Sequence, residues 1–209
     1  MRIFIFCSNL LVASCFFVSC KSKFSVSEYE NEVSKKAEYR SEYSDANTIV
    51  SCMYLPSTIL AVREVGNDIT NSEYRKNKFV EAKKSFQNFA YFKLTIRFKD
   101  GSSVLTNNLN DQAEYAQRLN YLSRGMGNDF FIVRPTGDTV RALTYEFERN
   151  YGNSPEAEAI FVFPKELTIG NGDDELQFHF VDRLLGIYNT VRLVFINKDL
   201  QEKEFNITF

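Results

Sequence analysis

Residues 79–101 read FVEAKKSFQNFAYFKLTIRFKDG, and the spacing of the apolar residues changes within this stretch. The first part has the spacing of one helix face, at Phe79, Ala82, Phe86 and Phe89. The second part alternates apolar with polar residues, at Phe92, Leu94, Ile96 and Phe98. Such alternation is typical of a half-buried strand, and Asp100-Gly101 is suited to the turn after it. A helix followed closely by a strand is therefore predicted.

The segment before this stretch is also predicted to be helical. Residues 57–65, STILAVREV, follow Pro56 and are closed by Gly66, which indicates one or two helical turns. Thr70 and Glu73 have the spacing of a capping box, in which a hydroxyl and a carboxylate bind the free N–H groups at a helix start. They predict the beginning of the second helix.

Residues 110–124 return to helical spacing and stop at Gly125, after which strands are predicted. The predicted strands are 129–134, 139–148, 157–163, 175–182, 190–197 and 203–209. Turns rich in Pro, Gly, Asn and Asp separate them, which favours an antiparallel β-sandwich or open barrel. The fold class is therefore α+β, with helices in the first half and strands in the second. The predicted core residues are Phe92, Leu94, Ile96, Leu143, Phe147, Phe161, Phe178, Phe180 and Phe195.

The first twenty residues, MRIFIFCSNLLVASCFFVSC, have the pattern of a secretory signal. One basic residue, Arg2, precedes an apolar run that polar residues interrupt. This run is too short and too polar for a permanent membrane span. The sequence becomes charged directly after Cys20, which marks the boundary of the signal.

Two segments resemble the lipobox of bacterial lipoprotein precursors of the Gram-negative type: Val12-Ala13-Ser14-Cys15 and Phe17-Val18-Ser19-Cys20. Only the first has a branched apolar residue at its start. Cys20 is nevertheless favoured, because lipidation of Cys15 would leave the apolar residues 16–18 at the new terminus. The resemblance implies acyl chains of the palmitate kind and attachment to a membrane, expected to be the outer membrane of the cell envelope. An ordinary signal with incidental cysteines is the alternative, and the body resembles no characterised family.

Three segments are expected: a signal peptide at 1–19, a lipid anchor and polar spacer at 20–47, and one globular domain at 48–209. Ser27 and Glu30 have capping-box spacing, so the spacer is expected to be partly helical, with disorder as the alternative. Lipidation of Cys20 would leave Cys52 without a partner, as a lone thiol that is either buried or a liability. If Cys15 carried the lipid, Cys20 and Cys52 could form a disulfide.

Few residues are candidates for catalysis or metal binding. The one histidine, His179, alternates with apolar residues, and a partner three positions on, Asp182, would face the opposite side of a strand. The acidic loop 171–175 lacks the ligand spacing of a calcium loop, and Gly125-Met126-Gly127 lacks the third glycine of a dinucleotide motif. We therefore predict no catalytic, metal or cofactor-binding residue, and do not expect an enzyme.

The chain has 25 basic and 27 acidic residues, a net charge of −2, and no run of more than two basic residues, which argues against nucleic-acid binding. Asp138-Thr139-Val140 is similar to a short O-glycosylation signal of exported Gram-negative proteins, so Thr139 is a candidate glycosylation site. The anchor and spacer favour a binding or assembly module that docks an envelope protein. The alternative is a glycan or ligand receptor, or a carboxylate-dependent hydrolase of wall or surface polymer.

Overall fold

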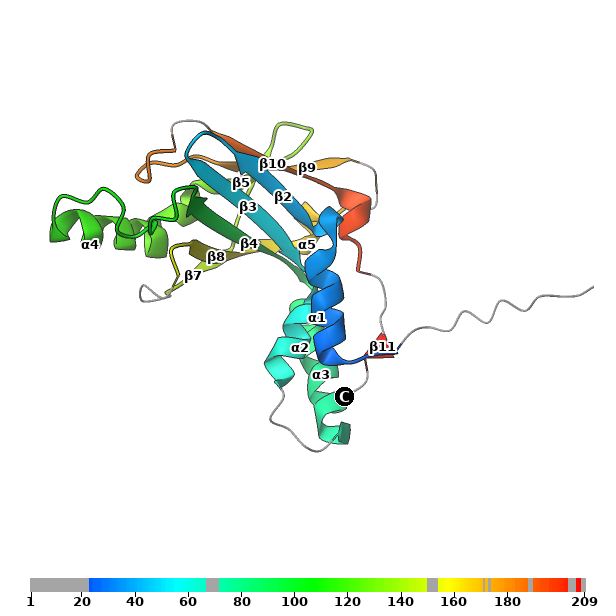
Figure 1. The fold of residues 1–209 in the computed structure, drawn as a ribbon. Helices are drawn as coiled ribbons and strands as arrows, with labels where there is room; N and C mark the ends of the chain where they lie inside the picture. The colour runs from blue at the N-terminus through cyan, green and yellow to red at the C-terminus, as the bar shows by residue number, and fades with distance from the viewer. Residues whose placement is uncertain are drawn as a thin grey trace, which may run out of the picture.

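The computed structural model describes residues 23–66, 72–149, 154–170, 172, 174–187, 190–202 and 206–207. Two antiparallel sheets pack face to face (Figure 1). The five-stranded sheet has the order β2 (Arg40–Ser44), β3 (Thr48–Leu55), β4 (Phe89–Phe98), β8 (Ala157–Pro164) and β7 (Thr144–Glu148). The four-stranded sheet has the order β10 (Val191–Ile196), β9 (Glu175–Phe180), β5 (Phe130–Val133) and β6 (Thr139–Arg141).

Aromatic side chains fill the space between the two sheets. The ring of Phe92 on β4 lies 4.5 Å from that of Phe178 on β9. Phe130 on β5 is likewise 4.5 Å from Phe161 on β8. Each of these strands buries alternate residues, which turns one face of each sheet toward the other. Burial of one Phe side chain contributes about 1.5–3 kcal/mol, so this layer holds the sandwich together.

The two sheets are also joined along both sides. On one side the Val194 amide of β10 donates a hydrogen bond of 2.8 Å to the Ser41 hydroxyl of β2. On the other side the chain crosses from β6 in one sheet to β7 in the other through residues 142–143. These connections protect the strand edges that an open sandwich would expose.

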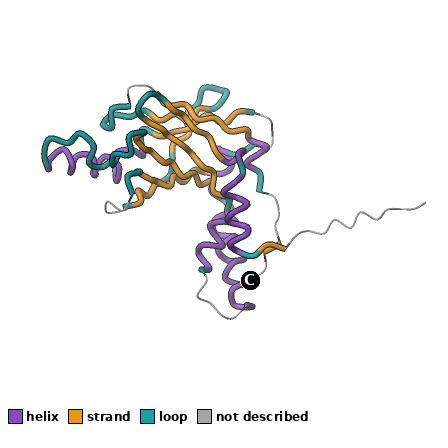
Figure 2. Tube along the Cα trace, in the orientation of Figure 1, coloured by secondary structure: helices purple, strands orange, loops and turns teal. Residues whose placement is uncertain are grey.

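Three helices form a group at one end of the sandwich, as Figures 1 and 2 show. They are α1 (Val26–Lys35), α2 (Ser57–Val65) and α3 (Ser72–Phe86). β3 leads into α2 and α3 leads into β4, so both helices lie at the same end of these two strands. Two further helices are α4 (Gln112–Asn120) and α5 (Lys165–Thr168), and a π-helical turn (Tyr121–Gly125) follows α4. The short strand β1 (Lys23–Phe24) pairs in parallel with β11 (Asn206–Ile207). The 3-10 turns are Ala37–Tyr39, Met126–Asn128 and Asn197–Leu200.

A carboxylate near the C-terminus caps α2. Glu202 accepts hydrogen bonds from the Ser57 amide at 2.5 Å, from the Ser57 hydroxyl at 2.7 Å and from the Thr58 hydroxyl at 3.2 Å. The Tyr54 hydroxyl also donates to it, at 3.4 Å. Burial, and then the nearby negative charge of Glu202, raise the pKa of Tyr54. Because the first N–H groups of a helix have no partner within it, Glu202 ties the C-terminal segment to the helical group.

The α+β class is confirmed, with helices mostly early and strands mostly later. The predicted helix at 57–65 and the strand through 92–98 are both present. Phe89 belongs to β4 rather than to the preceding helix, because α3 ends at Phe86. Leu143 is wrongly predicted as core: its side chain is 59% exposed, because the strand is interrupted at 142–143 and the alternation does not continue across the break. The other predicted core residues are buried.

The predicted spacer at 20–47 is corrected by the packing of its second part. The side chains of Tyr29, Val33 and Tyr39 are each only 1% exposed and belong to the main core, and β2 pairs with β3. The globular fold thus includes residues well before Thr48. The capping box of α1 is formed by Ser25 and Glu28, two residues earlier than predicted. The Thr70–Glu73 pair lies partly outside the described residues.

Candidate binding cleft

A cleft of about 610 Å³ lies at the end of the sandwich away from α1–α3. Four chain segments meet there: the β2–β3 turn, the end of β4, the loop that follows β4, and the loop that follows β9. The lining residues that matter for binding are Asn47, Phe98, Lys99, Asp100, Asn107 and Asn108. Ligand sites of drug-sized molecules occupy roughly 300–1,000 Å³, a range that includes this cleft.

The β2–β3 turn is fixed by an aspartate and attached to the end of β4. The Asp45 carboxylate accepts hydrogen bonds from the amides of Asn47 at 2.9 Å and Thr48 at 2.7 Å, as short aspartate turns do. The Lys99 amide donates to the Asn47 carbonyl at 2.8 Å, and the Lys99 ammonium donates to the Asp45 carbonyl. These bonds hold Asn47 and Lys99 side by side.

The loop after β4 is fixed at its start by Asp100. This carboxylate accepts hydrogen bonds from the Ser102 amide at 2.9 Å and the Ser102 hydroxyl at 2.6 Å. Both bonds stabilise the charged form, and the pKa of Asp100 is lowered as a result. The aspartate therefore stays ionised at neutral pH and keeps the first turn of the loop in place.

The same loop is held further along by α4. The Arg118 guanidinium donates to the carbonyls of Val104 at 3.0 Å and Asn107 at 2.8 Å. Next to the second contact, Asn108 has a positive φ of 50°, the left-handed conformation that asparagine tolerates better than most residues. The arginine thus fixes the backbone from which two lining asparagines project.

The fourth segment, residues 182–187, is organised by Asp182. Its carboxylate accepts hydrogen bonds from the amides of Leu184 at 3.0 Å, Leu185 at 2.9 Å and Ile187 at 2.8 Å. Gly186 adopts a φ of 84°, where a side chain would be strained. All four segments of the cleft are therefore held in place by side-chain to backbone hydrogen bonds.

An ion pair between a buried carboxylate and an exposed arginine also supports this loop. Asp129 is 3% exposed and lies 2.8 Å from the Arg183 guanidinium, while the Tyr121 hydroxyl donates to it at 3.1 Å. Burial and the nearby carboxylates raise the pKa of Tyr121. The phenol therefore stays a donor at physiological pH and keeps the buried carboxylate satisfied.

The chemical groups presented to the cleft are mostly neutral. The side-chain amides of Asn47, Asn107 and Asn108 make no hydrogen bond to other residues that the structure describes. Lys99 and Asp100 contribute one charge of each sign. A smaller hollow of about 260 Å³ shares Phe98 and Lys99 with the cleft and extends along the end of β4.

Of the residues singled out from the sequence, only Asp182 belongs to a segment of the cleft. His179 is on the outer, half-buried face of β9, and Asp182 serves the 182–187 loop. Thr139 is exposed on the edge strand β6. Cys52 is buried in β3, where burial raises the pKa of its thiol. Cys15, Cys20 and parts of the 171–175 loop lie outside the described residues, and no cluster of metal ligands occurs within the described ranges.

The cleft was not predicted from the sequence. Its clearest signal is the segment 101–110, GSSVLTNNLN, which is long and polar and lies between a strand and a helix. Loops of this length within a compact domain often have a function. No single residue type in it identifies a ligand.

The fold and the cleft together define an α+β sandwich with a loop-lined polar site at one end. Comparisons with protein-family models, with curated proteins and with solved structures found no match to this chain. Among the described helices, none combines the length and the apolar character needed to cross a bilayer.

Proposed function

We propose that this chain is a lipid-anchored binding module of the cell envelope, attached through Cys20, whose cleft binds a neutral carbohydrate. The observation that carries the proposal is the set of three asparagine amides around one preformed cleft, at Asn47, Asn107 and Asn108, which have no hydrogen-bond partner among the residues that the structure describes. A site whose loops are already ordered loses little conformational entropy when a ligand binds.

Amide side chains complement hydroxyl groups. An asparagine offers two N–H donors and one carbonyl acceptor, while a hydroxyl group both donates and accepts. Neighbouring hydroxyls of a sugar can therefore satisfy both ends of one amide. Phe98, half-buried between the cleft and the smaller hollow, supplies an apolar surface for the C–H face of a sugar ring.

The charges in the cleft favour a neutral ligand over a charged one. Lys99 and Asp100 are adjacent and opposite in sign, so an anion or a cation would meet one repulsive group. Both side chains also make hydrogen bonds within the protein: Lys99 donates to the Asp45 carbonyl, and Asp100 accepts from the Ser102 hydroxyl. Extended peptides usually add to an open strand edge, whereas turns and loops bound this cleft.

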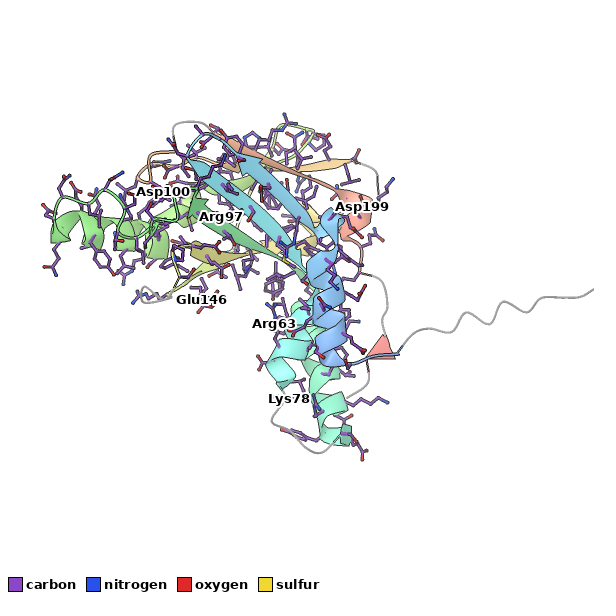
Figure 3. All side chains as sticks on the ribbon, viewed as in Figure 1. Arg63, Lys78, Arg97, Asp100, Glu146 and Asp199 are labelled. Carbon is purple, nitrogen blue, oxygen red and sulfur yellow. The ribbon has the colours of Figure 1, made fainter. Side chains whose placement is uncertain are left out.

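The position of the cleft suits a membrane-anchored receptor. β3 has eight residues and β4 has ten, which at about 3.3 Å per residue gives an extent of roughly 25–30 Å. The chain enters the fold at β1, beside α1–α3, and the cleft is at the far end of these strands (Figure 1). In Figure 3, Arg97 and Asp100 mark the cleft end, and Arg63 and Lys78 mark the helical end. An anchor at Cys20 would thus leave the cleft facing away from the membrane.

A printed array of neutral and acidic oligosaccharides tests the proposed ligand. We expect binding to neutral glycans, and a loss of affinity of about tenfold in Asn107→Ala, the change expected when one well-made pair of hydrogen bonds is removed. Asn31→Ala, an exposed asparagine of α1, is the matched control and should bind like the parent. Absence of glycan binding, or binding to acidic glycans alone, would overturn the proposed ligand.

Hydrogen–deuterium exchange with separated protein and polysaccharide fractions of the envelope tests the binding role itself. Protection by the polysaccharide fraction at 45–48, 99–108 and 182–187 is the expected result. Protection of the same segments by the protein fraction would keep the cleft as a binding site but replace the carbohydrate with a protein. Protection by neither fraction, or only in α1–α3, would reject the cleft as the site.

A further inference from the structure

We propose that α3 lies along an anionic bilayer surface and so orients the body relative to its anchor. The inference concerns the end of the molecule opposite the cleft and does not depend on the ligand of the cleft. It rests on the proposed lipid anchor only in that the anchor brings α3 close to a bilayer.

Positive charge is concentrated on α3. The helix sequence SEYRKNKFVEAKKSF has five basic residues and two acidic ones, in a chain whose net charge is −2. Two of the basic side chains reach backbone carbonyls: Arg75 donates to Gly66 at 3.4 Å and Lys78 to Glu64 at 3.3 Å. Such contacts leave the positive charge in place. Anionic lipid headgroups attract clusters of this kind, by about fivefold in partitioning for each lysine or arginine.

The outward face of α3 combines lysines with an exposed apolar residue. Lys76, Val80 and Lys84 follow each other at intervals of four residues, so they share one face. Val80 is 57% exposed, and both lysines are exposed as well. Tyr74 is 59% exposed but lies to the side of this face, because it is six positions before Val80. The exposed Glu73, seven positions before Val80, shares the face, so two lysines there are opposed by one acid. An apolar residue between basic residues is typical of helices that lie in a membrane interface.

The inward face of α3 is already occupied. Ala82 is buried there, Phe79 packs against the main core, and the ring of Phe86 lies 5.6 Å from that of Tyr91 on β4. α3 is therefore held against the domain by one face, and its lysine-bearing face is left for another surface.

The anchor would bring this face to a bilayer. Lys23, the first residue of β1, is three positions after Cys20, a separation of at most about 10 Å in extended chain. β1 lies beside the helical group that contains α3 (Figure 1). A lipid on Cys20 would consequently place α3 near the headgroups, with the cleft on the far side.

The test uses the full lipidated protein in nanodiscs, with an environment-sensitive fluorophore on a cysteine at Val80→Cys. Leu143→Cys is the matched control, because Leu143 is 59% exposed, like Val80, but lies on the sandwich. We expect brighter, blue-shifted emission at position 80 in discs containing phosphatidylglycerol, compared with discs of phosphatidylcholine alone. Position 143 should give the same emission in both, and Lys76→Glu with Lys84→Glu should abolish the difference at position 80.

Equal emission at position 80 in the two kinds of disc, or an equal change at position 143, would overturn the inference. In that case the protein would still be retained in the discs by its lipid. Failure of the protein to enter discs at all would instead contradict the anchor. A charge reversal at Arg124, which is exposed near the cleft end, should leave the emission at position 80 unchanged.

Discussion

His179 lies between an aromatic ring and a cation on the outer face of the four-stranded sheet. Its ring is 5.9 Å from that of Phe131 on β5, and its cross-strand neighbour on β10 is Arg192. Burial, and then the positive charge of Arg192, lower the pKa of His179 below its ordinary value of 6.5. Its Nε2 atom is enclosed and has no hydrogen-bond partner in the described part of the chain, which agrees with a neutral ring.

His179→Gln should make the free energy of unfolding less sensitive to acid. With the folded-state pKa lowered, the unfolded chain binds more protons below about pH 6.5, so the stability this group contributes is lost as the pH falls. Urea unfolding near pH 7 and near pH 5 measures the effect. Near pH 7 the free energy of unfolding of the variant should differ from that of the parent by no more than about 1 kcal/mol, because the variant loses the ring contact with Phe131. If the free energy of unfolding fell by the same amount between pH 7 and pH 5 in the variant and in the parent, the lowered pKa of His179 would be contradicted.

Phe178 and Leu143 provide a second comparison at the scale of the residue. Phe178 is fully buried and its ring packs against four other phenylalanines, so Phe178→Ala should cost about 3–5 kcal/mol. Leu143→Ala should change the free energy of unfolding by less than about 0.5 kcal/mol, the usual range for exposed positions. Urea denaturation of both variants gives these values, and equal losses would contradict the exposed position of Leu143 in the break before β7.

At the scale of the element, α2 depends on a residue far away in the sequence. Glu202→Gln keeps the shape of the side chain but removes the negative charge at the start of α2, and should lower stability by about 1 kcal/mol. The amides of α2 should also exchange hydrogen faster. Glu81→Gln, an exposed carboxylate on α3, is the control and should have little effect. Melting temperatures and hydrogen exchange check both variants, and equal behaviour would argue against the cap.

Elements with a strong hydrophobic period could be predicted from the sequence, and weaker ones could not. The alternation in β4 predicts its buried face correctly, because each of its apolar residues meets the same core. The helix α1 has only a thin apolar stripe, and its packing depends on Tyr29 and Val33 reaching a core made by distant strands. Local spacing contains no information about that core. The spacer prediction failed for this reason.

At the scale of the whole molecule, the proposed lipidation at Cys20 would decide how the protein is attached to a membrane. Cys20→Ala should release the protein from membranes or block its processing, while Cys15→Ala should leave it attached, because Cys15 would be removed with the signal peptide at 1–19. Acyl chains hold a protein by about 0.8 kcal/mol per buried methylene. Membrane fractionation and intact-mass measurement distinguish the two variants. A soluble mature chain with an unmodified start would rule out the anchor.

The cleft is a property of the whole molecule and could not be read from any one segment. Asn47 and Lys99 are adjacent because Thr48 pairs with Phe98 across β3 and β4. Asn107 joins them because Arg118 of α4 holds its carbonyl. The sequence predicts a turn at Asp100-Gly101, but it places Asn47 in the spacer. Only the register of the strands and the docking of α4 bring the residues of the cleft together.

The placement of β3 and β4 between the helical end, where the proposed anchor would be, and the cleft has a mechanical consequence. Tension between a captured polymer and the membrane would run along these strands and load their cross-strand hydrogen bonds in shear, all together rather than one after another. On the membrane side the load enters at β1, whose parallel pairing with β11 couples it to the C-terminal segment and, through Glu202, to α2. A tethered receptor built in this way would resist a steady pull better than one whose strands lay across the line of force.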